Sequence, residues 1–318
     1  MDRRIIFVLA VLAFIAVFLT ALAIGCSQDV ESIEIINIFS GADCTSPELV
    51  SVQPESGNVV RLVFSEPVKL YGDSMGTCQA RAEGKNVYVM LGSSLSPGMK
   101  ASLEGRVKDL SGNSTGFSVE VWGYNPAVPR ILINEFTTKG TAKSPDRTEL
   151  IVLGEGNVNG LALYAGTPGD YDARFVFGDI AVHEGDFITV WWTEALPEGA
   201  KTGSLDFCAG CEDGLSSNNG TLVLCSSPAL GARVLDAVVY SNFTASHDGF
   251  GTKTAQERAR WVLEAGSWNG EAADSSTSTS TRSVSRNRFS YDSDSCADWF
   301  VTVTGGATFG GPNDSDAY

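Results

Sequence analysis

The stretch Asp186–Trp192, with the sequence DFITVWW, carries the strongest β-strand signal in the chain. It combines β-branched and aromatic residues and directly follows a Glu-Gly pair that suits a turn. Such side chains pack well on a pleated sheet, and a short apolar run after Gly favours a strand over a helix. The stretch therefore predicts that this part of the chain is built from β-strands.

Similar short runs lie on both sides of this stretch, separated by turn residues and without a helical period. The predicted strands are Ile131–Phe136, Thr148–Leu153, Gly160–Tyr164, Arg174–Phe177, Gly220–Cys225 and Val234–Tyr240. Strands of this kind bury their apolar residues between two packed sheets. We therefore predict a β-sandwich over residues 130–313, followed by a short tail over residues 314–318.

The order of these strands resembles the lamin tail domain, an Ig-like sandwich found in nuclear lamins and in many bacterial exported proteins. The segments that carry the resemblance are Ile133–Phe136, Glu149–Leu153, Gly160–Tyr164, Glu184–Val190, Asn219–Leu224, Leu235–Tyr240, Ser283–Arg286, Asp298–Trp299 and Gly310–Asn313. The chain departs from the family in its added cysteines and in an insert between Asn242 and Thr281. The resemblance implies an Ig-like fold for residues 130–313.

The insert contains one stretch with helical character, Thr254–Glu264. Thr254 and Glu257 have the spacing of a capping box, which predicts the start of the helix at Thr254. Apolar residues recur at helical spacing on one face, at Ala255, Ala259, Val262 and Leu263. We expect this helix to pack across an edge of the sandwich, and binding of a partner is the alternative. The Ser/Thr-rich residues after it predict a loop.

Residues 47–124 predict another β-sandwich, with strands at Val59–Phe64, Val87–Leu91, Ala101–Val107 and Phe117–Trp122. The segments Pro47–Gly57, Leu62–Val68, Leu95–Gly98 and Val107–Asn113 resemble the bacterial Ig-like domains of surface-layer and adhesin proteins. In such modules these motifs make turns and fill the core. Residues 125–129, with two prolines, predict a stiff linker. The predicted fold class is therefore all-β, with two Ig-like sandwich domains in tandem.

The N-terminal stretch Met1–Ser27 begins with Arg3 and Arg4 and continues as an apolar run to Ile24. A positive head followed by an apolar run and a small residue predicts an export signal. Leu22–Cys26 resembles the lipobox of bacterial lipoproteins, in the relaxed form found in spirochetes. The resemblance implies cleavage before Cys26 and a thioether-linked diacylglycerol on that cysteine. Residues 1–25 would then be a hydrophobic signal helix, and residues 26–46 a tether.

The apolar run leaves two other interpretations open. It is long enough for an uncleaved transmembrane helix, and it also suits plain secretion without lipid. With Arg3 and Arg4 on the N-terminal side, each interpretation places the chain from Cys26 onward outside the cytoplasm. The predicted location is therefore the cell envelope, with a lipid anchor in a bacterial membrane. The sequence does not distinguish the cell surface from the periplasmic face of that membrane.

The charge balance argues against nucleic acid as a direct partner. The chain has 38 acidic and 22 basic residues, a net charge of −16, and the acids are spread along it. Such a surface repels phosphate backbones. We therefore expect the membrane, through the lipid anchor, and a protein or envelope ligand as partners, and no nucleic acid.

The seven cysteines are consistent with an exported chain. If Cys26 carries lipid, an even number remains, which favours disulfides without fixing their pairing. The remaining cysteines are Cys44, Cys78, Cys208, Cys211, Cys225 and Cys296. Cys44, near the end of the predicted tether, and Cys78, in the first predicted domain, are one pair that could form. For the other cysteines we predict disulfides, with a zinc site and a redox pair at the Cys208–Cys211 motif as alternatives.

No motif in the sequence predicts catalysis. His183 precedes a strand in a turn, and Ser246, His247 and Asp248 are sequence neighbours, which rarely face one another as a triad does. The oxygen atoms of Asn134, Glu135, Asp146 and Asp236 are hard ligands, which suit a Ca²⁺ site as one interpretation. A structural role is the competing interpretation, with Glu135 and Arg286 paired inside the sandwich. Glu66 and Asp109 are a second candidate set for a cation, and we expect them to form turns instead.

The sequence as a whole predicts a membrane-anchored exported lipoprotein. We expect a non-enzymatic binding, adhesion or envelope-structural module without catalytic residues, metal ligands or a cofactor other than the acyl lipid on Cys26. The alternative is a metal-dependent exported hydrolase, or an accessory subunit of one, because lamin-tail-like domains also occur beside exported nucleases and phosphatases.

Overall fold

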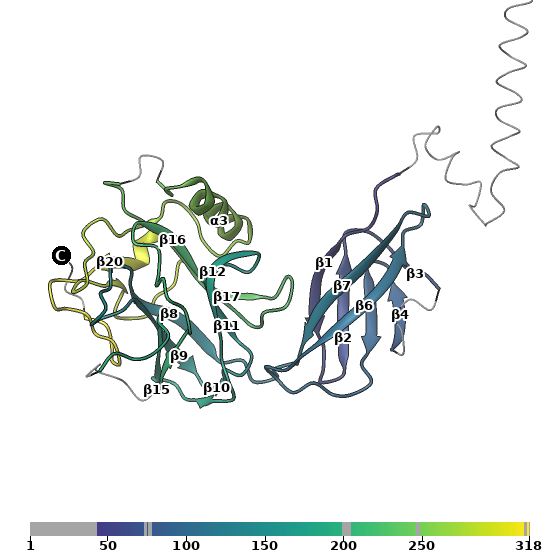
Figure 1. Cartoon of the computed structure of the whole chain (residues 1–318), viewed down its shortest axis with the longest axis horizontal. Helices are drawn as coiled ribbons and strands as arrows, with labels where there is room; N and C mark the ends of the chain where they lie inside the picture. The colour runs from purple at the N-terminus through teal and green to yellow at the C-terminus, as the bar shows by residue number, and fades with distance from the viewer. Residues whose placement is uncertain are drawn as a thin grey trace, which may run out of the picture.

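The structure is a computed structural model that describes residues 43–72, 75, 78–198, 205–245, 249–314 and 317. The predicted signal helix over residues 1–25, Cys26 and most of the tether lie outside these residues. Within them the chain is all-β and carries one short α-helix, as predicted, and it forms two sandwich domains (Figure 1). In this described part of the chain, no helix combines the length and the apolar character needed to cross a membrane.

The first domain packs a four-stranded sheet against a three-stranded sheet, and all its strands pair antiparallel. The larger sheet has the order β1-β2-β5-β4, with bounds Leu49–Pro54, Val59–Phe64, Asn86–Met90 and Gln79–Glu83. The smaller has the order β3-β6-β7, with bounds Lys69–Leu70, Lys100–Lys108 and Ser114–Trp122. Alternate residues of β2 are buried, as at Leu62 and Phe64, because every second side chain faces the other sheet.

The second domain packs a five-stranded sheet against a six-stranded one. The first has the order β12-β11-β16-β17-β18, with bounds Asp170–Val176, Ala162–Thr167, Asn219–Cys225, Val234–Ser241 and Ala273–Asp274. The second has the order β15-β14-β9-β8-β19-β20, with bounds Leu205–Cys208, Phe187–Trp191, Arg147–Gly154, Arg130–Thr137, Val284–Arg286 and Trp299–Val301. A small pair joins β10, Gly156–Asn157, to β13, Ala181–Val182, and a 3₁₀ turn, η1, covers Cys296–Asp298.

The strands β11 and β16 are buried on both faces. Every residue of β11 is buried, and so is every residue of β16 from Thr221 to Cys225. One face of their sheet meets the six-stranded sheet, and the helix α3, Lys253–Glu264, packs against β11, β16 and β17. This double cover explains why the run from Thr221 to Cys225 is nearly continuous in apolar residues rather than alternating.

The helix α3 differs from its prediction in two respects. It begins at Lys253, and Thr252 is the N-cap, with its Oγ1 accepting a hydrogen bond from the Ala255 amide at 3.3 Å. The capping box predicted at Thr254 is therefore wrong, because Thr254 already lies in the first turn. The helix also covers a sheet face rather than an edge, with Ala255, Ala259 and Val262 buried. It is further held by Arg258, whose guanidinium contacts two carboxylates of β12, those of Asp170 and Asp172.

The cap makes a stability prediction. Replacing Thr252 with Ala removes the acceptor for the Ala255 amide and should lower the free energy of unfolding by about 1 kcal/mol. The matched control is Thr254→Ala, at an exposed position inside the helix, which should leave it within about 0.5 kcal/mol of the wild-type value. Urea unfolding of both variants measures this. A larger loss for Thr254→Ala than for Thr252→Ala would restore the capping box.

Candidate functional site

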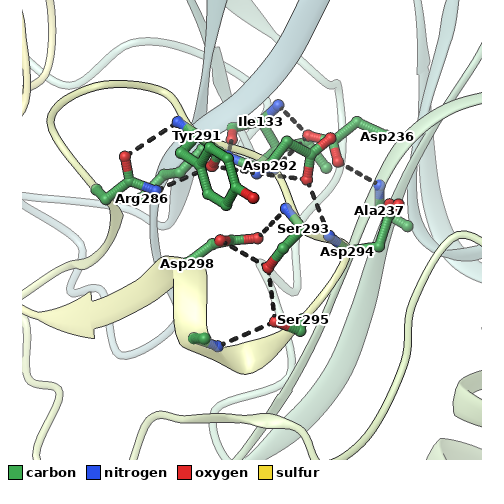
Figure 2. Close-up of polar contacts among 12 residues, drawn as sticks. Ile133, Asp236, Ala237, Arg286, Tyr291, Asp292, Ser293, Asp294, Ser295 and Asp298 are labelled. Carbon is green, nitrogen blue, oxygen red and sulfur yellow. Dashed lines mark hydrogen bonds and ion pairs between the residues drawn. The ribbon is translucent and has the colours of Figure 1, made fainter.

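The side chain of Arg286, at the end of β19, lies fully buried between the two sheets of the second domain. Its Nε donates to the carbonyl of Ile133 on β8 at 2.7 Å, and its Nη2 reaches the carboxylate of Asp236 on β17 at 2.7 Å. Its Nη1 contacts the Asp292 carboxylate at 2.8 Å and the Tyr291 carbonyl at 3.4 Å (Figure 2). One guanidinium therefore joins both sheets to the loop that follows β19.

The surroundings of Arg286 explain why this residue type stands here. A planar guanidinium offers several donors in a fixed fork, so it can satisfy acceptors from separate segments at once. The ring of Trp299 lies 4.7 Å from the guanidinium carbon, which covers one face of the fork with a cation–π contact. A lysine at this position would have neither the fork nor the flat face.

The carboxylate of Asp236 is buried with its partner. Besides Arg286 it accepts hydrogen bonds from the amide of Ile133 at 2.6 Å and from its neighbour Ala237 at 2.8 Å. Burial raises the pKa of Asp236, while the Arg286 guanidinium opposes that rise by favouring the charged form. The sequence prediction that Arg286 pairs with Glu135 is therefore wrong, because the acids that face it are Asp236 and Asp292.

The loop over residues 287–295 is tied to this centre. Asn287 accepts hydrogen bonds from the amides of Phe289 and Tyr291 at 3.2 and 3.0 Å, and its own amide donates to the Tyr291 carbonyl at 2.9 Å. The carboxylate of Asp298 accepts from the Ser293 amide at 2.7 Å and from its hydroxyl at 2.9 Å (Figure 2). The backbone of the loop is thus ordered by side chains that belong to the domain interior or to the loop itself.

Two large aromatic side chains project from this ordered loop. Phe289 is 77% exposed and Tyr291 is 66% exposed, the highest values among the described aromatic residues. The Arg288 guanidinium lies 4.6 Å from the centre of the Phe289 ring. We call residues 287–295 the aromatic loop. Its combination of a held backbone and exposed aromatic side chains suits recognition of a partner surface.

A second polar network joins the strands β8 and β9 of the six-stranded sheet to the chain around residues 308–313. Glu135 and Glu149 stand opposite each other on β8 and β9, and both bind the chain near its C-terminal end. Glu135 accepts from the amide and hydroxyl of Thr308 at 3.0 Å, and Glu149 accepts from the Gly310 amide and from the Asn134 side chain. Burial raises the pKa of Glu135, and it raises that of Glu149 to about 8.

Asn134 on β8 and Asn313 belong to the same network. Each side-chain amide donates to the side-chain oxygen of the other, at 2.9 and 3.0 Å, and Asn313 also donates to the Arg286 carbonyl at 2.8 Å. The two polar networks are therefore continuous through β19. Asn134 and Glu135, weighed from the sequence as Ca²⁺ ligands, are occupied by bonds to the chain itself.

The described residues contain two groups of acids whose oxygens lie close enough to hold one cation. The group Asp236, Asp292 and Asp294 already contains the guanidinium of Arg286 as its counter-charge. The other group joins Asp43, Glu66 and Asp109 in the first domain. There Asp109 accepts from the backbone and side-chain amides of Asn113 at 2.8 and 2.7 Å, which is the turn-forming use expected for it.

Asp146, the last of the candidate Ca²⁺ ligands from the sequence, also binds backbone amides of this chain. The carboxylate of Asp146 accepts from the amide of Gly140 at 2.6 Å and from that of Leu215 at 2.9 Å. Neither close group of acids in the described residues includes Asp146 or Glu135. The Ca²⁺ set weighed from the sequence is therefore not brought together.

The predicted disulfides of the second domain are not formed. Cys208, Cys211, Cys225 and Cys296 are free thiols, and so is Cys78 in the first domain. Cys208 ends β15, and Cys296 begins η1, which leads into β20, so they lie at opposite edges of one six-stranded sheet. Neighbouring strands are about 4.8 Å apart, so residues at the two edges of this sheet are several strand spacings apart. A disulfide needs Cα atoms within about 7 Å, so these two cysteines are too far apart to pair. Cys225 is buried in the other sheet, where burial raises the pKa of its thiol to about 12.

The remaining candidate residues from the sequence lie either outside the described residues or at the surface. Cys26, the predicted lipidation site, and the neighbours Ser246, His247 and Asp248 lie outside the described residues. Cys44 is exposed near the start of the described chain. His183 is exposed in the turn before β14, and its amide donates to Asp186 at 2.8 Å.

A protein-family model matches the second domain. The family model TP_1001_2nd, described as a protein second domain, matches residues 129–203 and 196–301, which together cover more than half of the chain. The chain belongs to this family. The matched region includes β8 to β20 and the aromatic loop.

A crystal structure of a DUF4876 family protein from Bacteroides thetaiotaomicron VPI-5482 is similar at 10% sequence identity and a TM-score of 0.36. The similarity covers 79% of this chain and 91% of that chain. Comparison with curated proteins found no match.

The buried pair yields a prediction for stability. Arg286→Met leaves Asp236 without its counter-charge inside the domain and should lower the free energy of unfolding by about 3–5 kcal/mol. Asp236→Leu should also destabilise, but the double variant should lose less than the sum of the two single losses, because no unpaired charge then stays buried at Asp236. Urea unfolding of the four proteins gives the coupling energy.

The exposed variant Arg288→Met is the matched control and should change stability by less than about 0.5 kcal/mol. If the two single losses add in the double variant, Arg286 and Asp236 act independently and do not form an energetically coupled pair.

Proposed function

We propose that this protein is a non-catalytic binding module of the bacterial cell envelope. In this proposal a lipid on Cys26 holds the chain at a membrane, the first domain acts as a spacer, and the second domain contacts a partner. Support for the anchor comes from the lipobox-like stretch Leu22–Cys26, and support for the two modules from their resemblance to bacterial Ig-like and lamin tail domains.

The observation that carries the binding role is the aromatic loop. Exposed Phe289 and Tyr291 offer a large apolar contact area, and aromatic residues dominate the energetics of many interfaces. The loop is held by Arg286, Asn287 and Asp298 before any partner arrives. A partner therefore meets a surface that needs little ordering, which removes part of the entropy cost of association.

The polar groups inside the second domain fit a scaffold. The carboxylates of Glu135, Glu149 and Asp236 have raised pKa values, which can mark catalytic groups. Each of them, however, accepts hydrogen bonds from backbone amides of this chain. Such bonds hold segments together, and they support a binding module over an enzyme.

The anchor is tested by replacing its cysteine. Cys26→Ala should abolish incorporation of labelled palmitate and should release the protein from the membrane fraction of a bacterial host or leave it as an uncleaved precursor. The matched control is Cys44→Ala, which keeps the lipobox-like stretch and should retain both the label and the membrane location. Unchanged acylation and membrane retention in Cys26→Ala would show that the lipoprotein proposal is wrong.

The aromatic loop is tested with the full chain in detergent and with cell envelopes of the organism that makes it as the probe. Wild-type protein should bind the envelopes saturably. The variant Phe289→Ser/Tyr291→Ser should bind at least tenfold more weakly with an unchanged melting temperature, because both side chains are exposed.

Phe243→Ser is the matched control, since Phe243 is a partly exposed aromatic residue outside the loop. It should bind like the wild type. Equal binding by wild type and the loop variant, or no saturable binding by the wild type, would contradict the proposal.

A further inference from the structure

The two domains meet at a junction with defined contacts. The turn between β16 and β17 reaches from the second domain to the outer edge of β1, where the Val52 amide donates to the Leu230 carbonyl at 2.8 Å (Figure 1). Ala229 in this turn is buried within the apolar core of the first domain. Asn125, between the domains, donates to the carbonyls of Asn157 and Asn159 at 2.8 and 2.9 Å. The junction therefore has a defined shape.

A cavity of about 620 Å³ lies at this junction. Its wall comes from β1, from the segment between the domains and from the β16–β17 turn. Val52, Pro54 and Val128 supply apolar surface. Pockets of about 300–1,000 Å³ at domain junctions are common places for small ligands. The volume and position of the cavity therefore fall within the range of small-ligand sites.

The side chains that line the cavity carry a positive charge, whereas the protein as a whole is negative. The chain carries a net charge of −16, with 38 acidic residues, yet no Asp or Glu lines the cavity. Arg233 is the one charged residue in its lining. An anion attracted to this wall meets a guanidinium without a competing carboxylate, whereas a cation meets no counter-charge in the wall.

Some polar side chains that line the cavity are hydrogen-bonded within the protein, and others are not. Gln53 is bonded to Arg61 and Ser51, and Asn125 bridges the domains. By contrast, within the described residues the guanidinium of Arg233 and the hydroxyls of Tyr124 and Ser226 have no hydrogen-bond or ion-pair partner. This differs from Arg258 and Arg286, each of which contacts two carboxylates.

We propose that this junction cavity binds a small organic anion, a carboxylate attached to an apolar ring or chain. The planar fork of Arg233 matches the two oxygens of a carboxylate, and such charge-assisted pairs are the stronger hydrogen bonds. Tyr124 and Ser226 supply further hydrogen bonds, and Val52, Pro54 and Val128 contact the apolar part. The site is independent of the aromatic loop, so it adds a ligand to the proposed binding module rather than a partner for that loop.

The test compares three probes that share one ring system and differ in charge: indole-3-acetate, the neutral alcohol indole-3-ethanol and the cation tryptamine. Isothermal titration calorimetry with the full chain in detergent should show saturable binding of indole-3-acetate. The alcohol should bind at least tenfold more weakly, and tryptamine should give no saturable binding. Higher salt should weaken binding of the acid, because Arg233 is exposed at the rim.

Variants assign the binding to this cavity. Arg233→Gln should weaken binding of indole-3-acetate at least tenfold, and Arg233→Lys should be intermediate, because it keeps the charge and loses the fork. The matched control is Arg130→Gln, an exposed arginine next to the same junction but outside the lining, which should bind like the wild type.

The unchanged melting temperature of Arg233→Gln would exclude loss of folding as the cause of weaker binding. Equal binding of the three probes, binding by Arg233→Gln equal to that of the wild type, or absence of saturable binding by the wild type would overturn the proposal.

Discussion

The buried charge of Arg286 is the constraint on which the second domain depends. Taking a guanidinium out of water is unfavourable by several kcal/mol unless its donors find acceptors inside. Here the acceptors are a carbonyl of β8, a carboxylate of β17 and the loop beyond β19. The two sheets and the loop must therefore hold their relative positions for the charge to be satisfied. Misplacing any one of them leaves an unpaired charge in the interior, so the network penalises alternative packings.

This constraint reaches the surface through the aromatic loop. The same guanidinium that joins the sheets also binds the Tyr291 carbonyl and the Asp292 carboxylate, so the shape of the loop is set partly from within the core. The exposed rings of Phe289 and Tyr291 are thus carried by a segment whose backbone is already ordered. The helix α3 is tied to the other sheet in a related way, because Arg258 contacts two carboxylates of β12. Two arginines therefore tie a loop and a helix to the two sheets of this domain.

Local patterns in the sequence were sufficient to predict most strands. The run Asp186–Trp192 became β14, Phe187–Trp191, and Val59–Phe64 became β2 with the same bounds, because their alternation or β-branched content is a local property. The strand β4, Gln79–Glu83, was missed, since its charged and small residues resemble a loop and it is ordered only by pairing with β5. The helix was found, but its start moved to Lys253 because Thr252 rather than Thr254 caps it.

The candidate site could be predicted only in part. Arg286 was expected inside the sandwich, yet its partner was assigned wrongly, because the choice between Glu135 and Asp236 depends on which strands of the opposite sheet face β19. The disulfides of the second domain were inferred from an even cysteine count, which contains no information on distance across a sheet. The aromatic loop was missed altogether. Its signal was the pair Phe289 and Tyr291 among polar residues, where apolar side chains have no alternating partner to bury them.

The hydrogen bonds between Asn134 and Asn313 affect the order in which the second domain folds. These residues are 179 positions apart, on the first strand of the second domain and just before the end of the chain. Until residues 308–313 have left the ribosome, Glu135 and Glu149 lack the amides that solvate them inside the domain. Contacts this distant in sequence form late in folding, so these carboxylates gain their amide partners only after the rest of the sheet has paired. The segment 308–313 is therefore the part of the chain that completes the interior of this domain.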